Sequence, residues 1–289
     1  APARWLLRPL SDIPVIEKRL RTGKGAKRSQ AFTVLRNGHR ALLMGSVSDF
    51  DAFTFFEFQG RSVLVHRDVD GRALKGEETV LDLYIEEAKE SDLEALYQRY
   101  FELKDLPALR AKPATGYTSW YYHYNRLTPD DLYSVIDRSV ETGAPLDVIQ
   151  IDDGFQRRVG DWFDLKPEFG GSLRPIVDRI HKAGYRAGLW LAPFVAEARS
   201  SIMREHPDWI ARDRRGRMIK AGFNPLWSYW FYALDLQNEE VREYLHMVFR
   251  VVLEEWDFDL LKLDFLYAAA LQEPRTMSRA QLMADGVNL

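Results

Sequence analysis

The chain has 289 residues, of which 46% are hydrophobic and 29% are charged, and its formal net charge is -3. This balance is typical of a soluble globular protein and argues against nucleic acid or an anionic membrane as the main partner. Cysteine does not occur in the sequence, which excludes disulfides, thiolate zinc sites and thiol catalysis. We therefore expect a small molecule as the ligand.

The chain begins APARWLLRPLSDIP, a stretch without an apolar region of signal-peptide length. No run approaches the ~18 apolar residues of a membrane span. A mature or cropped chain can have lost such a segment, so the sequence leaves the compartment open. We expect a cytoplasmic location and no membrane partner.

Short strand-like runs separated by turn signals fill the first part of the chain, residues 1–112. The predicted strands are residues 31–35, 41–47, 53–58 and 62–69. The pair Asn37-Gly38 favours a hairpin turn between the first two strands. A helical stretch at about 91–103 and a connection that contains Pro107 and Pro113 follow. We predict antiparallel β structure with a linker helix.

Strands and helices alternate from residue 113 to residue 289. The predicted strands are residues 116–120, 148–152, 185–193 and 260–267. Helices are predicted to begin after the N-cap residues Thr128, Ser172 and Asn238, and residues 278–289 also have a helical pattern. A longer connection, before Asn238, carries the motifs HPDW and FNPLW. Apolar strands separated by amphipathic helices indicate the α/β class, with a parallel sheet covered on both faces.

Polar and aromatic residues gather at the predicted carboxyl ends of these strands. Asp152 and Asp153 end the second strand, and Trp190 lies near the end of the third. Lys262 and Asp264 lie towards the end of the fourth. Because the carboxyl ends of parallel strands form the functional face of an α/β protein, we expect these side chains to converge.

Lys262 and Asp264 are the two charges in the otherwise apolar run LLKLDFLY, residues 260–267. Side chains alternate along a strand, so the two charges point to the same side and are available to each other. They form either a structural ion pair or a pair that faces a pocket. In a pocket, Lys262 would help to keep Asp264 ionised as a nucleophile or anion stabiliser.

The residues on the other strands have structural explanations as well. Asp152 and Asp153 either cap the following loop, as Asp often does in turns, or bind a ligand. Trp190 is either a core residue or a platform for a sugar ring, because Gly188 and Ala192 on the same face leave room beside its ring.

A metal site is a further interpretation of the three aspartates. Asp152, Asp153 and Asp264 together could bind a divalent cation, which prefers carboxylate oxygen, but Lys262 beside them argues against it. No His cluster, Gly-rich phosphate loop or Gly-x-Ser-x-Gly elbow occurs. We expect neither a metal nor a cofactor.

Seven motifs in one order carry a family resemblance. They are GYTSWYYHY (116–124), IDDGF (151–155), GDW (160–162), GLWLAPF (188–194), HPDW (206–209), YALDL (232–236) and KLDFLY (262–267). With these motifs the sequence resembles glycoside hydrolase family 36, the α-galactosidases, from about residue 113 to about 270 and more faintly before that.

The resemblance implies a retaining glycosidase with a (β/α)8 TIM barrel behind an N-terminal β-sandwich domain. In such enzymes the residue that matches Asp264 is the nucleophile, and those that match Asp152 and Asp153 hold galactose hydroxyls. The residue that matches Lys262 contacts a hydroxyl beside the nucleophile. The residues expected to line the sugar pocket are Trp190, Trp120 and Trp162.

Two departures from the family pattern stand out. Many members carry an Arg just before the strand that resembles YALDL, where this chain reads WSYW (227–230). The family's general acid is an aspartate well downstream of the nucleophile, which would lie beyond Leu289. The 177 residues from Pro113 onward (289 - 112) are fewer than the ~250 of a complete barrel. We therefore expect about the first half of the barrel, in an incomplete chain.

The leading hypothesis is an α-galactosidase that, when whole, acts on small oligosaccharides such as melibiose or raffinose. The alternatives are a non-catalytic sugar-binding fragment, an α-N-acetylgalactosaminidase or a galactosyl-transferring relative. The expected partners are the α-galactoside substrate, a missing C-terminal part of the same protein and, since tetramers occur in the family, further copies of the chain.

Overall fold

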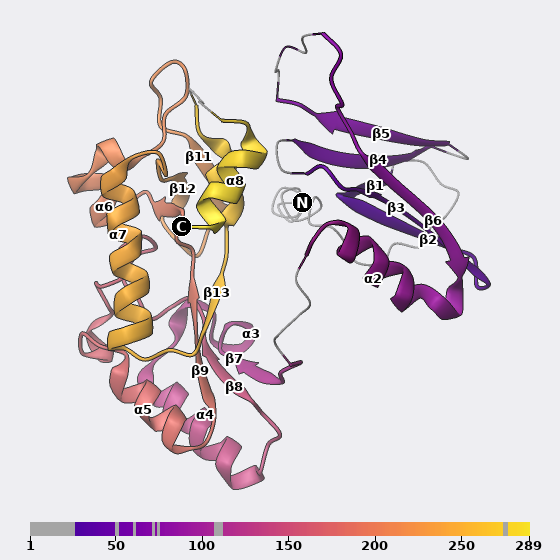
Figure 1. Cartoon of the computed structure of the whole chain (residues 1–289). Coiled ribbons are helices and arrows are strands. Elements are labelled where there is room, and N and C mark those ends of the chain that lie inside the picture. The colour runs from indigo at the N-terminus through magenta and orange to yellow at the C-terminus, as the bar shows by residue number, and fades with distance from the viewer. Residues whose placement is uncertain are drawn as a thin grey trace, which may run out of the picture. The chain divides into compact units, whose positions relative to one another are not determined.

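The computed structural model describes residues 27–49, 52–59, 62–70, 73, 76–106, 112–273 and 277–289. The chain forms two compact units that divide at Arg110 (Figure 1). Each unit has its own cluster of buried apolar residues. Among the described residues, no helix is long and apolar enough to cross a membrane.

The N-terminal unit contains two antiparallel three-stranded sheets. The first sheet has the order β1 (Lys27–Gln30), β4 (Phe53–Gln59), β5 (Ser62–Asp68), and the second has the order β2 (Phe32–Arg36), β3 (Arg40–Ser46), β6 (Leu83–Lys89). The antiparallel strands predicted in this part are all present. The sequence KRSQ of β1 and the charged sequence LYIEEAK of β6 lack a strong apolar pattern, and these two strands were not predicted.

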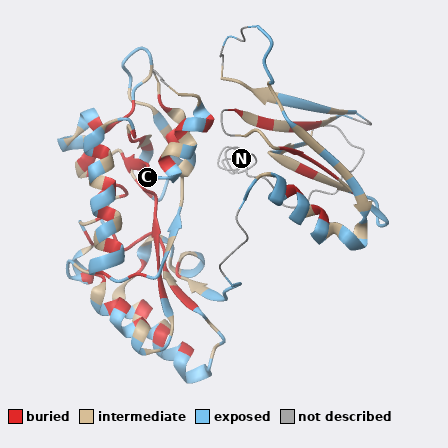
Figure 2. Cartoon of the chain, viewed as in Figure 1, coloured by how far each residue is buried: buried red, intermediate tan, exposed pale blue. Residues whose placement is uncertain are grey.

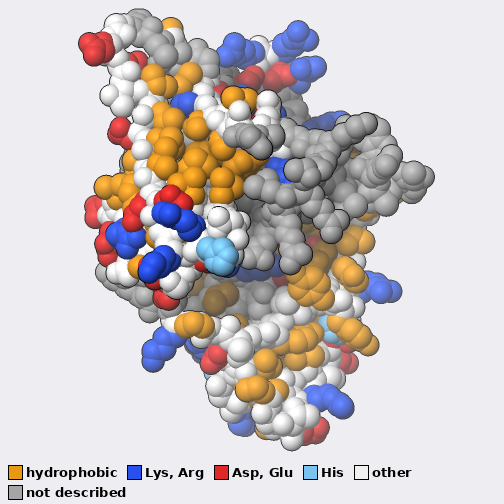
Figure 3. Space-filling view, turned by 90° about the vertical axis from the view of Figure 1, so that its right-hand side faces the viewer, with side chains coloured by type: hydrophobic (Ala, Val, Ile, Leu, Met, Phe, Trp, Pro, Cys, Tyr) orange, Lys and Arg blue, Asp and Glu red, His pale blue; other side chains and the backbone are white. Residues whose placement is uncertain are grey.

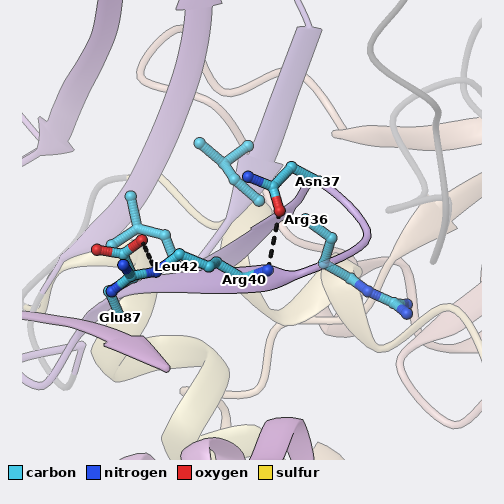
Figure 4. A pocket seen from close by; sticks show the side chains of 6 residues that line it. Arg36, Asn37, Arg40, Leu42 and Glu87 are labelled. Carbon is cyan, nitrogen blue, oxygen red and sulfur yellow. Dashed lines mark hydrogen bonds and ion pairs between the residues drawn. The ribbon is translucent and has the colours of Figure 1, made fainter. Parts of the chain in front are cut away.

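The Asn37-Gly38 pair makes the predicted turn between β2 and β3. Gly38 adopts a φ of 89°, a left-handed conformation that glycine reaches without a steric penalty. The Asn37 side-chain oxygen accepts hydrogen bonds from the backbone N–H groups of His39 (3.0 Å) and Arg40 (2.8 Å). A hollow beside this turn is lined by Leu35, Leu42 and four polar side chains, of which Arg40 pairs with Glu87 (Figure 4).

Helix α2 (Leu93–Leu103) packs on the second sheet through Leu96 and Tyr100, both fully buried. The Tyr100 hydroxyl donates to the Ser46 carbonyl at 2.7 Å. Gly45 leaves the space for this ring, because a Cβ there would lie 2.5 Å from it. Elsewhere the unit exposes apolar side chains such as Ile85, and hydrophobic side chains gather on the face seen in Figure 3.

The C-terminal unit is built on a four-stranded parallel sheet, which confirms the α/β class. Its strands are β7 (Gly116–Thr118), β8 (Val148–Ile151), β9 (Arg186–Leu191) and β13 (Leu260–Leu263), and neighbours in the chain are neighbours in the sheet. The two central strands are largely buried, whereas the edge strands are more exposed (Figure 2).

Helices connect the parallel strands in the chain. They are α4 (Pro129–Thr142) between β7 and β8, α5 (Arg174–Lys182) between β8 and β9, and α7 (Glu239–Arg250) before β13. The Asn238 side chain accepts from Glu240 N–H at the start of α7, as predicted. For α5 the predicted cap was wrong by one residue: Leu173 is the N-cap, while the Ser172 hydroxyl accepts from Arg174 N–H.

The connection between β9 and α7 contains an antiparallel sheet that was not predicted. Its order is β10 (Val195–Glu197), β12 (Tyr229–Ala233), β11 (Lys220–Asn224). This sheet lies beyond the carboxyl ends of β9 and β13 (Figure 1). The other α-helices described in the unit are α3 (Trp120–His123), α6 (Ser201–Glu205) and α8 (Arg279–Val287).

The start of α4 is fixed by a capping box, which the sequence signal at Thr128 anticipates. The Thr128 hydroxyl accepts from Asp131 N–H at 3.3 Å, and the Asp131 carboxylate accepts from Thr128 N–H at 2.9 Å. The hydrogen bond from the Thr128 hydroxyl also holds the pKa of Asp131 below its usual range. At the other end, Gly143 takes the left-handed conformation that closes the helix.

Replacing Thr128 tests this capping box. Thr128→Ala should lower the free energy of unfolding by about 1 kcal/mol, because Asp131 N–H loses its acceptor. Urea unfolding followed by circular dichroism measures the change. Ser134→Ala, at an exposed site within the same helix, should change the value by less than about 0.5 kcal/mol. Equal losses in the two variants would contradict the capping role.

Candidate active site

Asp152 stands directly after β8, and its carboxylate collects donors from three of the four parallel strands. Its side chain is 3% exposed. Oδ2 accepts from Lys262 Nζ on β13 at 2.8 Å, from Gln150 Nε2 on β8 at 2.8 Å and from Thr118 Oγ1 on β7 at 3.3 Å. The Asp152 backbone N–H donates to the Ser119 hydroxyl at 2.9 Å. A buried carboxylate needs this many partners to offset the loss of water.

Lys262 therefore pairs with Asp152, and the predicted pairing with Asp264 was wrong. The predicted strand 260–267 ends at Leu263, so Asp264 does not continue the alternation of side chains. Phe265 has a φ of 55°, and the chain leaves the sheet there. The Lys262 side chain, 43% exposed, instead reaches Asp152 at the end of a strand that is not its neighbour.

Asp264 has a different set of contacts at the edge of the sheet. Its Oδ2 accepts from Trp190 Nε1 at 3.1 Å, and its Oδ1 accepts from Phe265 N–H at 2.8 Å. Its own N–H donates to the Leu191 carbonyl on β9 at 2.8 Å. The residue is half-buried, in contrast to the buried Asp152 and Asp153. These contacts orient the carboxylate and leave part of it accessible.

Asp153 is buried and held on both oxygens. Oδ2 accepts from Trp227 Nε1 at 2.7 Å, and Oδ1 accepts from Gln156 Nε2 at 2.7 Å. Burial raises the pKa of the Asp153 carboxyl, and the hydrogen bonds from Trp227 and Gln156 oppose that rise. Trp227 is therefore part of the candidate site, although its contact with Asp153 was not predicted from the sequence.

Tryptophan side chains connect these carboxylates. The Trp190 ring lies 6.2 Å from the ring of Trp227 and 6.0 Å from the ring of Trp162, in edge-on arrangements. Trp190 is 2% exposed and Trp162 is fully buried. Both rings support the site in this structure and present almost no face to solvent. Trp120 is half-buried on α3, and its ring packs 5.2 Å from that of Tyr124.

A second layer of acidic groups holds the surrounding loops. Asp161 accepts backbone hydrogen bonds from Ser201 at 2.6 Å and Ile202 at 3.2 Å, at the start of α6. Glu197 forms an ion pair with Arg158 at 3.0 Å, and burial raises the pKa of the Glu197 carboxyl. These contacts explain both acids as structural residues of the connections around the site.

Sequence reasoning missed four side chains that donate hydrogen bonds to Asp152 or Asp153: Trp227, Gln156, Gln150 and Thr118. The signal for Gln150 was present, since it is the one polar residue in the strand VIQI. Among the described residues, no group of three or more His, Cys, Asp or Glu side chains is arranged to hold a metal ion.

Comparisons with known proteins point to one family. A family model described as Melibiase matches residues 106–282. The chain is 30% identical over 153 residues to the bifunctional alpha-galactosidase/sucrose kinase of Mediterraneibacter gnavus, covering 50% of this chain and 15% of that protein. It is 24% identical over 206 residues to an alpha-galactosidase of Escherichia coli, covering 67% and 28% of the two chains.

Solved structures agree with this result. The alpha-galactosidase from Thermus thermophilus, in complexes with p-nitrophenyl alpha-D-galactopyranoside and with stachyose, superposes with a TM-score of 0.69. In the first complex it is 34% identical and covers 90% of this chain and 50% of its own. A GH36 alpha-galactosidase from Geobacillus stearothermophilus in complex with raffinose, 18% identical, shares the fold with a TM-score of 0.59, over 83% of this chain and 37% of its own. The chain thus spans about half or less of the length of each of these relatives.

The contact between Trp227 and Asp153 predicts a pH-dependent loss of stability. Trp227→Phe keeps an aromatic ring but removes the N–H donor, so the folded-state pKa of Asp153 should rise further above its unfolded value. A raised carboxyl pKa costs stability where Asp153 is ionised, and the cost disappears as the pH falls through the folded and then the unfolded pKa. We expect a loss of roughly 2 kcal/mol at neutral pH that shrinks in acid.

Urea unfolding at a series of pH values measures this effect. Trp209→Phe is the matched control, because the buried Trp209 donates its Nε1–H to the exposed carboxylate of Glu240. Its effect should be smaller and nearly independent of pH. A pH-independent loss for Trp227→Phe would show that the ring, and not the hydrogen bond to Asp153, matters at this site.

Proposed function

The chain belongs to the melibiase family, and on this basis we propose that the whole protein is a retaining glycoside hydrolase that releases terminal α-galactosyl residues from small oligosaccharides. The observation that carries the proposal is the setting of Asp264. Its carboxylate is oriented by Trp190 and by the Phe265 N–H, and it is the most accessible of the three aspartates. The relatives' complexes with stachyose and raffinose favour α-galactosides as the substrate class.

In the proposed mechanism, a carboxylate oxygen of Asp264 attacks the anomeric carbon of the galactosyl unit. The bond from that carbon to the leaving oxygen breaks, and a general acid gives the leaving oxygen a proton. Water then attacks the anomeric carbon of the covalent intermediate, gives up a proton to the same group and releases Asp264. Two displacements at one carbon retain the α configuration of the sugar.

Lys262, Asp152 and Asp153 are proposed to bind the sugar in this mechanism. The Lys262 side chain is 43% exposed and its ammonium uses one donor on Asp152, so it has N–H donors left for a hydroxyl beside the nucleophile. Asp152 and Asp153 would accept hydrogen bonds from galactose hydroxyls through lone pairs not used within the protein. Trp190, Trp162 and Trp120 are proposed to shape the walls of the pocket.

The general acid is proposed to lie outside these 289 residues. Retention requires two carboxyl groups ~5 to 5.5 Å apart across the glycosidic bond. Asp153 has a raised pKa, but it is buried and both its oxygens accept hydrogen bonds. Glu197 has a raised pKa as well, but it is buried in its ion pair with Arg158. We therefore propose neither group as the general acid.

Replacing the nucleophile tests the proposal in the protein expressed from its complete reading frame. Asp264→Ala should lower kcat for p-nitrophenyl α-galactoside by at least about 10⁴-fold, because no carboxylate attacks the sugar. Azide should restore turnover and yield β-galactosyl azide, since a small anion fits the space left by the side chain. Wild-type activity should survive a chelator, and a chelator-sensitive reaction would favour the metal-site alternative.

The matched control is Asp208→Ala, which removes an exposed aspartate from the short 3-10 helix Pro207–Trp209 after α6 and should leave kcat within twofold. Residual activity of Asp264→Ala within tenfold of wild type would contradict the nucleophile assignment. Rescue by azide without inversion of the product would contradict the retaining mechanism.

The isolated 289-residue chain tests the position of the acid. We expect it not to cleave raffinose, whose sugar leaving group needs a proton, even where circular dichroism shows a folded chain. Cleavage of raffinose by this chain, abolished by Asp264→Asn, would place the acid within these residues.

A further inference from the structure

Exposed aromatic side chains of the C-terminal unit are concentrated around the carboxyl ends of the parallel strands. Within the described part of this unit, the exposed aromatic side chains belong to three segments. They are Tyr121, Tyr122 and Tyr124 after β7, Phe223, Tyr229 and Trp230 in the β11–β12 hairpin, and Tyr267 after β13. The outer helices α4, α5 and α7 contribute none. Aromatic rings thus surround the candidate site and are not spread over the surface.

The β11–β12 hairpin is attached to the candidate site at several points. At its turn, Trp227 donates to Asp153. At the base of β11, the Ala221 carbonyl accepts from the hydroxyl of Tyr267 at 2.8 Å. Tyr267 lies three residues after Asp264 in the chain. The hairpin is therefore held next to the proposed nucleophile.

The two faces of the hairpin have different environments. Trp227 and Phe231 are buried against the site, with their rings 5.0 Å apart. On the other face Phe223 pairs with Trp230 across the strands, and its ring also stacks on Tyr229 with centroids 5.9 Å apart. The exposed fractions of Phe223, Tyr229 and Trp230 are 48%, 57% and 42%.

A cation completes the exposed face. Lys220 Nζ lies 4.0 Å from the centroid of the Trp230 ring, a cation–π contact that orients both side chains. Tyr229 adopts a φ of 70°, an uncommon conformation for a bulky residue, and in this conformation its ring stacks on Phe223. Aromatic rings beside a lysine suit a ligand that is apolar on one face and carries hydroxyl groups at its edge.

We propose that Phe223, Tyr229 and Trp230, with Lys220, form a binding subsite for the sugar units on the leaving-group side of an α-galactoside oligosaccharide. The proposal rests on the proposed function. A pyranose ring offers its C–H face to the rings and its hydroxyls to the Lys220 ammonium. The hairpin is joined to the site through Trp227, and on this continuity we assign its exposed rings to the part of an oligosaccharide that lies outside the site. A sugar is favoured over a protein partner by this continuity.

Steady-state kinetics of the protein expressed from its complete reading frame test the subsite. The double variant Phe223→Ser/Tyr229→Asn removes the stacked pair, and Asn tolerates the left-handed backbone at position 229. We expect KM for stachyose to rise about tenfold, as for the loss of one good contact. Inhibition by free galactose, which has no leaving group, should change less than twofold. Met247→Ser removes an exposed apolar side chain from α7 and should change neither value.

The other results each overturn the proposal. Unchanged kinetics for stachyose would show that the hairpin does not bind the leaving group. An equal loss for stachyose and galactose would show that the hairpin acts on the site through Trp227 alone. A change in oligomeric mass, measured by light scattering, would identify the exposed face as an interface between copies. If the wild-type protein cleaved no α-galactoside, the proposed function itself would fail, and the subsite with it.

Discussion

The convergence of three donors on Asp152 is the interaction on which the candidate site depends. Lys262, Gln150 and Thr118 come from three strands, and all reach one oxygen of a carboxylate that is 3% exposed. Removing one donor would leave the others to compensate a buried charge, which is costly. These donors lie towards the carboxyl ends of β13, β8 and β7. Gly188 on the strand between β13 and β8 leaves room, since a Cβ there would lie 3.1 Å from the Gln150 side chain.

In this arrangement Asp152 and Asp264 are held by different partners. Because Lys262 is engaged with Asp152, the orientation of Asp264 depends on Trp190, whose ring packs against Trp227. Trp227 in turn holds Asp153. The nucleophile candidate and Asp153 are thus linked through buried indole rings, with no direct ion pair between Lys262 and Asp264. A change at Trp227 would therefore alter two carboxylates at once, one by a hydrogen bond and one by packing.

Local sequence signals predicted the elements of the parallel sheet well, because caps and apolar periodicity act over a few residues. Thr128, Asn238 and the apolar strands belong to this class. The convergence of Asp152 with Lys262 followed from the rule that carboxyl ends of parallel strands meet. The ion-pair partner of Lys262 was not predicted correctly. The prediction applied the alternation of side chains along a strand as far as Asp264, whereas β13 ends at Leu263 and the chain leaves the sheet at Phe265.

The contact of Trp227 with Asp153 could not be predicted from the sequence, for a related reason. It lies 74 residues from Asp153 in the chain, on a hairpin whose strands carry no clear alternation. Only the pairing of β12 with both β10 and β11 brings it to the site. The sandwich arrangement of the N-terminal sheets, the half-barrel and the substrate contacts of Trp120 and Trp162 stay predictions, since each depends on packing or on a ligand that a local pattern does not specify.

The exposed edge of β13 has a consequence for the electrostatics of the site. Two unit charges 4 Å apart attract by about 1 kcal/mol in water and by roughly four times as much at the effective dielectric constant near a protein surface. The ion pair between Lys262 and Asp152 has one buried partner and one half-exposed partner, so its strength depends on what covers β13. A strand paired with β13 would strengthen the attraction and also raise the cost of desolvating Lys262. Contacts at this edge would therefore tune how readily Lys262 turns from Asp152 to a substrate hydroxyl.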